Sequence, residues 1–358
     1  MSCRGTLCYH IAADRRWTTM AQTMNFSADE MCPDPFAERT AERHAMDVQV
    51  LGGQFRFSSD HAALLDVVAM AYGGLPSQLL PGIAPAFQIE LRLSPARQVA
   101  ENEPPLVQMQ SGAGFLCGVM DASNYAVLFP QQRRALIVAS PDMLARPYHL
   151  RYELIEFTVF TLATRALGLV PLHAACVGWH GRGALVMGAS GAGKSTLALH
   201  AWMAGLEFLS EDAVFVHAQG GQALGVANYL HVTPGTLQLL GDDGFRHDVE
   251  RSPVIRRRSG VEKYEVDLRG GRGHLAQGPL DVACVVFASR RYAQEGEALI
   301  TAMSEQEISA RLAAEQPYAA SRPGWDGFVA KVKQWGAYEL RRGTNPFASV
   351  DAVKRLLG

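Results

Sequence analysis

The chain is poor in cysteine. Only six occur among its 358 residues, and they are widely scattered. No C-x-x-C pair is present, so the spacing that zinc sites usually require is missing. A framework of disulfides is not expected in a chain of this length. Reduced thiols in a cytoplasmic protein are therefore the simpler interpretation.

The sequence also lacks a strong charge of either sign and a long apolar run. Its formal net charge is −2, which provides no general attraction to nucleic acid or to anionic lipid. The N-terminal region has no apolar signal-peptide core. The most apolar helical stretch, residues 157–170, includes Arg165 and is shorter than the roughly 20 residues that a membrane span needs. We expect a cytoplasmic protein with neither a nucleic-acid nor a membrane partner.

What the chain does contain is enough apolar material for a large core. Hydrophobic residues make up 48% of the sequence and charged residues 19%, a balance typical of folded chains. Its length suits two domains. We interpret residues 1–45 as a loose accessory segment, residues 46–147 as a small α+β domain for substrate recognition, and residues 148–358 as an α/β domain that ends in helices.

Local patterns in residues 46–147 predict one hairpin, one helix and several strands. Residues 48–57 form a hairpin around Gly52 and Gly53, and a helix follows that Ser58, Ser59 or Asp60 could cap and that stops at Gly73. Apolar and polar residues alternate over 87–93, which indicates a half-buried strand. Short strands are also expected over 115–119, 125–129 and 135–139, arranged as a meander.

In the rest of the chain, helices are expected before and after a central group of strands along the sequence. One helix is expected over residues 148–168. Near the C-terminus, Ser304 and Glu307 form a capping box, residues 328–340 are expected to be helical, and Asn345 with Pro346 begins a final helix to Leu357.

Gly188–Thr196 carries the strongest chemical signal. Its sequence, Gly-Ala-Ser-Gly-Ala-Gly-Lys-Ser-Thr, fits the phosphate-binding pattern G-x-x-x-x-G-K-[ST]. A predicted strand over 184–187 enters this loop and a predicted helix over 195–204 leaves it. We expect ATP or another nucleoside triphosphate with Mg²⁺, Lys194 reaching the β- and γ-phosphates and Ser195 ligating the metal. The predicted nucleotide-binding residues are Gly188, Ala189, Ser190, Gly191, Ala192, Gly193, Lys194, Ser195 and Thr196.

The strand that enters the loop is predicted to be the second arm of a hairpin. Residues 174–179 form the first arm, and a two-residue turn at Gly181 and Arg182 would place Trp179 opposite Ala184. Continued backwards, this register places His173 opposite Ser190. We therefore interpret His173 as a site residue, the alternative being an ordinary structural histidine.

Two adjacent acids, Glu211 and Asp212, follow the predicted helix. Neighbours on a strand point to opposite faces, so we expect different roles for them. A kinase needs one carboxylate to accept the proton of the acceptor hydroxyl and another group to hold Mg²⁺. The alternative is a turn acid next to a solvated strand end. The candidate catalytic residues are His173, Lys194, Glu211 and Asp212, and the candidate metal ligands are Ser195 and Asp212.

Three pieces of the sequence resemble the HPr kinase/phosphorylase superfamily, which includes HPr-kinase-like proteins of modified-peptide (lasso-type) biosynthetic clusters. They are Leu172–Val177, Gly188–Ser195 and Phe208–Asp212, within a similar region over about residues 168–220. The resemblance implies a hairpin-fed P-loop domain like that of phosphoenolpyruvate carboxykinase, phosphotransfer to a serine hydroxyl, and homo-oligomers as a common state. It also implies that Glu211 is the base, that His173 tunes it, and that Asp212 assists with metal.

The sequence departs from the family in two places. Relatives generally have Asp-Asp where this chain has Glu211 and Asp212, so the carboxylate lies one methylene further out. The bifunctional enzymes carry Leu-Glu-Ile-Arg-Gly, whereas the corresponding stretch here, residues 226–235, has no carboxylate. A second metal site and a phosphorylase reaction therefore lack support.

Three functions remain open from the sequence. The first is a serine kinase of a protein or peptide, the second a kinase of a small molecule such as a free amino acid or sugar, and the third a nucleotide-gated binding protein without transfer. Arginines at positions 251 and 256–258 could contact phosphate or an acidic peptide, or could form a solvated loop. Lys263 and Arg269 are further candidates for contact with the nucleotide.

Overall fold

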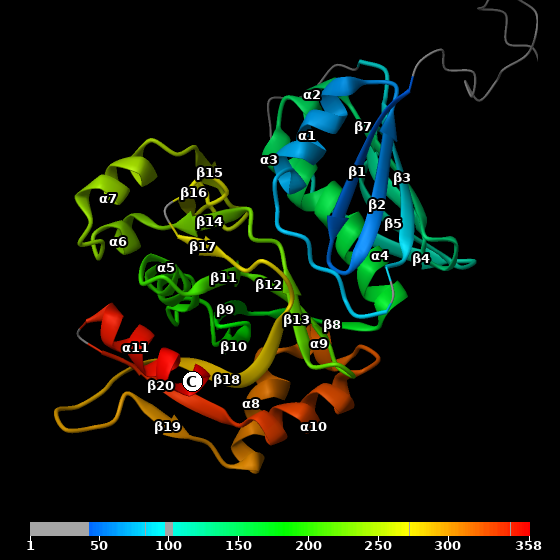
Figure 1. The fold of residues 1–358 in the computed structure, drawn as a ribbon. Coiled ribbons are helices and arrows are strands. Elements are labelled where there is room, and N and C mark those ends of the chain that lie inside the picture. Colours follow the sequence, from blue (N-terminus) through cyan, green and yellow to red (C-terminus); the bar gives the residue numbers. More distant parts are fainter. Residues whose placement is uncertain (1–42, 83, 97–102, 272, 344) are drawn as a thin grey trace, which may run out of the picture. The chain divides into compact units, whose positions relative to one another are not determined.

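The structure, a computed structural model, describes residues 43–82, 84–96, 103–271, 273–343 and 345–358. Most of the expected loose segment over residues 1–45, with Cys3, Cys8 and Cys32, lies outside these ranges. Residues 42–358 form one compact unit in which helices and mixed sheets alternate along the chain (Figure 1). None of the helices within the described ranges is long and apolar enough to cross a membrane.

The first part of this unit is a seven-stranded mixed sheet in the order β1-β2-β3-β7-β6-β5-β4. The hairpin between β1 and β2 turns at Leu51 and Gly52, which both have positive φ. This hairpin and the expected meander are confirmed. The exposed edge strand β4 was not expected, because none of its residues is buried and its sequence shows no alternation. The strands are β1 His44–Val50, β2 Gly53–Ser59, β3 Ala86–Leu93, β4 Gln108–Gly112, β5 Phe115–Asp121, β6 Asn124–Phe129 and β7 Arg134–Ala139.

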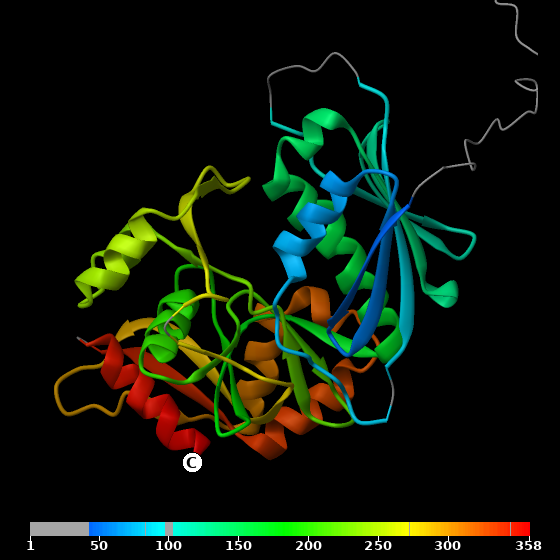
Figure 2. The ribbon, with the colours of Figure 1, turned by 45° about the horizontal axis from the view of Figure 1, so that its top comes forward.

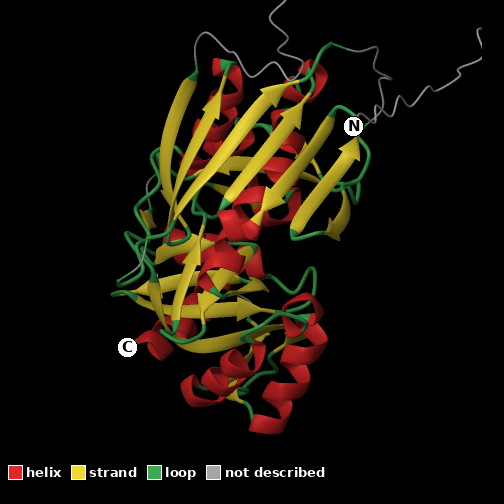
Figure 3. Cartoon of the chain, turned by 90° about the vertical axis from the view of Figure 1, so that its right-hand side faces the viewer, coloured by secondary structure: helices red, strands yellow, loops and turns green. Residues whose placement is uncertain are grey.

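Helices pack against this sheet and bury its core (Figure 3). The expected helix is confirmed as α1, Ala62–Tyr72, which ends at Gly73. Its capping differs from the expectation, because His61 occupies the N-cap position without a side-chain cap. Ser59 Oγ instead accepts a hydrogen bond from the backbone N–H of His61 at 3.0 Å. A short helix, α2, spans Pro141–Leu144.

The expected helix over 148–168 is confirmed as one continuous helical stretch with an unusual middle. It consists of α3, Pro147–His149, a π-helical segment, Leu150–Glu156, and α4, Phe157–Leu167. Gly168 ends it in the left-handed conformation, with φ of 61°. The π-helical segment buries Arg151 and Glu156. Such segments are rare and often occur at functional sites.

A second, ten-stranded sheet follows, with the path β17-β11-β9-β10-β18-β13-β12-β8 and with β20 and β19 added beside β18. Its central strand β10 is buried on both faces. Ala184 and Val186 pack into one core and Leu185 and Met187 into the other, as strand alternation requires. The strands are β8 Leu169–His173, β9 Ala175–Trp179, β10 Arg182–Met187, β11 Glu207–Ser210, β12 Ala213–His217, β13 Gln222–Gly225, β17 His274–Leu275, β18 Leu280–Tyr292, β19 Ile300–Ala302 and β20 Ala337–Arg342.

Helices cover both faces of this sheet (Figure 2). On one face lie α5, Lys194–Met203, and α11, Pro346–Leu357; on the other lie α8, Glu305–Glu315, α9, Pro317–Ala320, and α10, Trp325–Trp335. The capping box at Ser304 and the cap at Asn345 are confirmed. The helix expected over 328–340 is wrong in its second half, because Gly336 adopts φ of 86° and ends α10. Residues 337–342 then pair with β18 as β20.

A small three-stranded sheet in the order β14-β16-β15 stands beside α5. Its strands are β14 Tyr229–Val232, β15 Val254–Arg256 and β16 Glu262–Asp267, and the helices α6, Pro234–Leu237, and α7, Asp243–Glu250, connect β14 to β15. Cys117, Cys176 and Cys284 are free thiols, in agreement with the expectation for this part of the chain.

Candidate functional site

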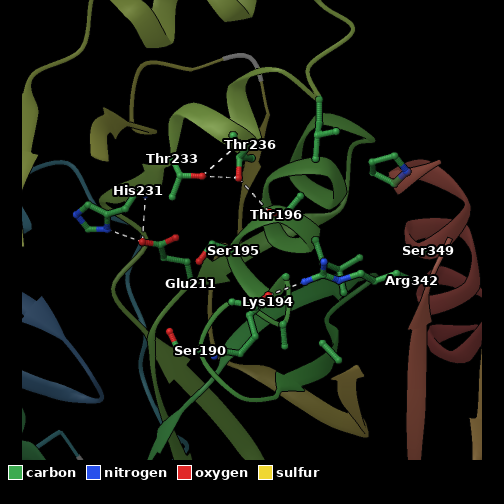
Figure 4. A pocket seen from close by; sticks show the side chains of 18 of the residues that line it. Ser190, Lys194, Ser195, Thr196, Glu211, His231, Thr233, Thr236, Arg342 and Ser349 are labelled. Carbon is green, nitrogen blue, oxygen red and sulfur yellow. Dashed lines mark hydrogen bonds and ion pairs between the residues drawn. The ribbon is translucent and has the colours of Figure 1, made fainter. Parts of the chain in front are cut away.

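A pocket of about 690 Å³ opens where the loop after β10 meets α5, β14 and the β15–β16 hairpin. Its volume lies in the range typical of sites for small ligands and cofactors. Figure 4 shows Lys194, Ser195 and Thr196 at the start of α5, with Glu211 and His231 beside them. The predicted residues His173 and Asp212 also line it. The fold thus brings together all four candidate catalytic residues.

The hairpin that leads into the loop is present, but its predicted register is wrong by two residues. Its turn lies at His180 and Gly181, with φ of 53° and 75°, so that Trp179 is opposite Arg182. Both turn residues take the left-handed conformation that a tight hairpin needs. The predicted pair and the observed pair each contain Gly181 and one other residue, so the sequence did not distinguish between them.

His173 reaches the pocket by a different pairing. It is the last residue of β8, and β8 pairs with β12, so that His173 lies opposite Ala213. Gln316, which ends α8, binds the His173 backbone twice. Its Oε1 accepts from the N–H at 2.9 Å and its Nε2 donates to the carbonyl at 3.0 Å. The side chain of His173 is thereby placed beside Asp212.

Three glycines shape the loop over residues 188–193. Gly188, Gly191 and Gly193 have positive φ of 142°, 75° and 106°. A Cβ on Gly188 would lie 2.7 Å from the carbonyl oxygen of Ala288. Of the nine predicted nucleotide-binding residues, Ser190–Thr196 line the pocket, whereas Gly188 and Ala189 form the turn behind it.

Lys194 is buried at the start of α5, and its Nζ donates a hydrogen bond to the carbonyl oxygen of Gly188 at 2.8 Å. Burial lowers the pKa of this ammonium from its usual value, although Asp212 and Glu315 counteract the effect. The free backbone N–H groups of the first turn of α5 are suited to an anion.

Two arginines on neighbouring strands donate hydrogen bonds to the loop. They were not predicted from the sequence. Arg290, near the end of β18, donates to the carbonyl oxygen of Ser190, and Arg342, at the end of β20, donates to that of Gly191. Arg342 also lines the pocket. No local pattern marks these two residues, because only sheet pairing brings them to the loop.

Asp212 lies between His173 and Arg257. Its Oδ1 is 3.1 Å from His173 Nδ1, and its Oδ2 accepts from Arg257 at 3.4 Å. Burial opposes ionisation, but the hydrogen bond and charge of His173, together with Arg257, outweigh it and hold the pKa of Asp212 well below its usual range. Asp212 is therefore a carboxylate at neutral pH.

Glu211 points away from Asp212 and is buried. Its Oε1 accepts hydrogen bonds from the backbone N–H of His231 at 3.1 Å and from the His231 ring. Its Oε2 has no hydrogen-bond partner among the described residues. The two acids thus occupy different environments, but the strand expected through them is wrong, because both lie in the bend between β11 and β12. The resemblance implied that His173 tunes Glu211. In the structure, however, His173 contacts Asp212, and the histidine that contacts Glu211 is His231.

His231 is the most informative residue that the sequence analysis did not single out. It lies on β14, within the 226–235 stretch that was notable only for lacking a carboxylate. Its side chain is 5% exposed. Burial lowers the pKa of His231, but hydrogen bonds to Glu211 and Glu265 more than compensate, so its pKa is raised.

The arginine cluster at 256–258 divides among three environments. Arg257 lines the pocket and contacts Asp212. Arg258 binds Glu153 of the π-helical segment, and Arg256 is exposed on β15. Of the other two basic candidates, Lys263 lines the pocket, whereas Arg269 binds Asp267 and backbone carbonyls near the end of α1.

Within the described ranges, no group of three or more His, Cys, Asp or Glu side chains is arranged to hold a metal ion by itself. In comparisons with known proteins, no family model matches this chain and no curated protein matches it.

Proposed function

We propose that this protein is an ATP-dependent kinase that transfers the γ-phosphate to a serine hydroxyl of a protein or peptide. One observation carries the proposal. Glu211 is a buried carboxylate with one unpartnered oxygen, and it lines the same pocket as Lys194 and Ser195. A polar atom left without a partner in a buried position is costly. The unpartnered oxygen is explained if Glu211 receives a proton there during the reaction.

The loop over residues 188–193 and the start of α5 would bind the phosphates. Their backbone N–H groups and the positive end of the helix dipole favour an anion at this position. Lys194 is next to the loop already, since it donates to Gly188. When phosphate is bound, its ammonium would exchange that carbonyl for β- and γ-phosphate oxygens.

The residues present suit Mg²⁺ brought in by a nucleotide. Such an ion usually takes only one or two protein ligands, and phosphate oxygens and waters complete its shell. The Ser195 hydroxyl and the ionised Asp212 carboxylate would provide these two oxygens. When bound, the ion neutralises charge on the β- and γ-phosphate oxygens.

Glu211 would act as the general base in the transfer. Its Oε2 takes the proton of the acceptor hydroxyl while the hydroxyl oxygen forms a bond to the γ-phosphorus. The bond between that phosphorus and the β–γ bridging oxygen breaks, and its electron pair leaves with the nucleoside diphosphate. Lys194 and Arg257 are two of the cations lining the pocket, and they could stabilise the charge on the transferring group.

The test is transfer of labelled γ-phosphate from ATP to serine-containing candidate peptides in the presence of Mg²⁺. Glu211→Gln keeps the size of the side chain and removes the base, so we expect transfer to fall about 100-fold or more. Glu250→Gln, on the exposed side of α7, is the matched control and should keep full activity.

Other outcomes identify other functions. A folded Glu211→Gln variant as active as the unaltered protein would contradict the proposed base. Faster phosphorylation of free serine or a sugar than of any peptide would indicate a small-molecule kinase. Nucleotide binding without transfer to any acceptor would indicate a nucleotide-gated binding protein.

A further inference from the structure

Glu211 is held by only one of its two oxygens. The Oε1 atom accepts from both the backbone N–H and the ring Nδ1 of the same residue, His231, and the Oε2 atom remains without a partner in the described part of the chain. Both side chains are 5% exposed. This arrangement leaves Oε2 as the oxygen of Glu211 that can still accept a hydrogen bond.

The hydrogen-bond partners of His231 determine the protons on its ring. An ionised Glu211 can only accept, so Nδ1 must donate to it. On the other side, Nε2 lies 3.0 Å from the Tyr152 hydroxyl. That hydroxyl donates its hydrogen to Glu265 Oε1 at 3.1 Å. Nδ1 is therefore the ring atom that holds Glu211, and Nε2 lies beside Tyr152 and Glu265.

The surroundings of the ring suit a cation and keep it in place. Glu265 Oε1 lies 3.4 Å from Nε2 and also accepts from Arg151. Arg151 is in turn sandwiched between the rings of Tyr152 and Tyr229, at 4.4 and 4.3 Å from their centroids. These residues come from β14, β16 and the π-helical segment. A chain of contacts thus runs from the helix that joins the two sheets to Oε1 of Glu211.

We propose that His231 is the positioning residue of Glu211, and that Tyr152 and Glu265 orient its ring so that Glu211 Oε2 faces the acceptor hydroxyl. This inference rests on the proposed kinase function. A base must lie within hydrogen-bond reach of the proton it takes, and a displacement of about 1 Å can cost about 100-fold in rate. Without His231, Glu211 could rotate about its side-chain bonds, and Oε2 would no longer face the acceptor hydroxyl.

Two substitutions of His231 test the proposal, because they place a hydrogen-bond donor at different positions. The amide nitrogen of His231→Asn matches Nδ1 and can still bind Glu211, whereas that of His231→Gln matches Nε2 and cannot. We expect His231→Gln to lower kcat about 100-fold with the KM for ATP unchanged, and His231→Asn to recover a large part of that loss. His247→Asn, at an exposed position of α7, is the control.

A second pair of variants tests the contact between His231 Nε2 and the Tyr152 hydroxyl. Tyr152→Phe removes the hydroxyl beside Nε2 and should lower kcat about tenfold. Tyr318→Phe removes the hydroxyl of an exposed tyrosine on α9, and it should leave kcat unchanged. Melting temperatures separate these effects from loss of the fold.

The decisive readouts are kcat and the nitrogen-15 NMR signals of His231 at neutral pH. The proposal requires a proton on Nδ1 and a change at Nδ1 in Glu211→Gln. It is overturned if His231→Gln keeps full kcat while Glu211→Gln is inactive, or if Nδ1 carries no proton. A wild-type chain that transfers phosphate to no acceptor refutes the kinase instead, and the NMR signals then decide alone whether His231 positions Glu211.

Discussion

His173 Nδ1 lies 3.1 Å from Asp212 Oδ1, and so each of the two adjacent acids has a histidine of its own. Asp212 is half-exposed and has Arg257 as a further partner, whereas Glu211 is buried with His231. A carboxylate that accepts a hydrogen bond from an arginine stays ionised and is suited to a metal ion. A carboxylate with one free oxygen is suited to a proton. This division supports separate roles for the two acids.

Substitution of Lys194 tests the nucleotide end of the pocket. Lys194→Met keeps the apolar stem but removes the only charge that extends from the loop sequence itself, so we expect kcat/KM to fall about 100-fold or more. Nucleotide affinity, measured by calorimetry, should fall as well. Lys333→Met, which alters an exposed lysine of α10, should change neither quantity. Unchanged affinity in Lys194→Met would remove the loop from the proposed phosphate site.

Gly188→Ala tests whether the loop requires glycine at its first position. Gly188 has φ of 142°, and the new Cβ would lie 2.7 Å from the Ala288 carbonyl oxygen. Backbone cannot move aside as a side chain can, so we expect a loss of about 1–3 kcal/mol in the free energy of unfolding and weaker nucleotide binding. Gly278→Ala, where a Cβ meets nothing within 4 Å, is the control in denaturant titrations. Equal stability of the two variants would contradict this account of the loop.

Glu156 makes the stability of the fold depend on pH. Burial raises its pKa from 4.5 to about 7, although Arg151 and His231 counteract part of the effect. The folded state then binds more protons than the unfolded state between these two values. The contribution is fully present below about pH 4.5, is lost as the pH rises through about 7, and does not change above that.

Glu156→Gln removes this dependence. Compared with the variant, the unaltered protein should lose roughly 3 kcal/mol of unfolding free energy between pH 4.5 and pH 8. Urea titrations of both proteins at several pH values measure the difference directly. Glu250→Gln on the surface of α7 should follow the unaltered protein. Parallel curves for Glu156→Gln and the unaltered protein would show that Glu156 has an ordinary pKa.

Much of the secondary structure could be predicted because its signals are local. The β1–β2 hairpin, α1, β3 and the strand–loop–helix around Gly188 follow from turn residues, alternation and glycine spacing within a few positions. The edge strand β4 carries no such signal, since all of its residues are exposed. Beyond Trp335, the apolar pattern continued past a glycine that ends the helix, and so the prediction of helix there was wrong.

The sequence by itself determined the phosphate-binding pattern at Gly188–Thr196, because that pattern depends on neighbours along the chain. Only the tertiary structure decided the partners of Glu211 and Asp212, which lie in a bend between two strands and not on a strand. His231 lies 20 positions from Glu211 in the sequence, and Tyr152 lies 79 positions from His231. Strand register and side-chain packing bring such residues together, and a single sequence contains no local signal for either.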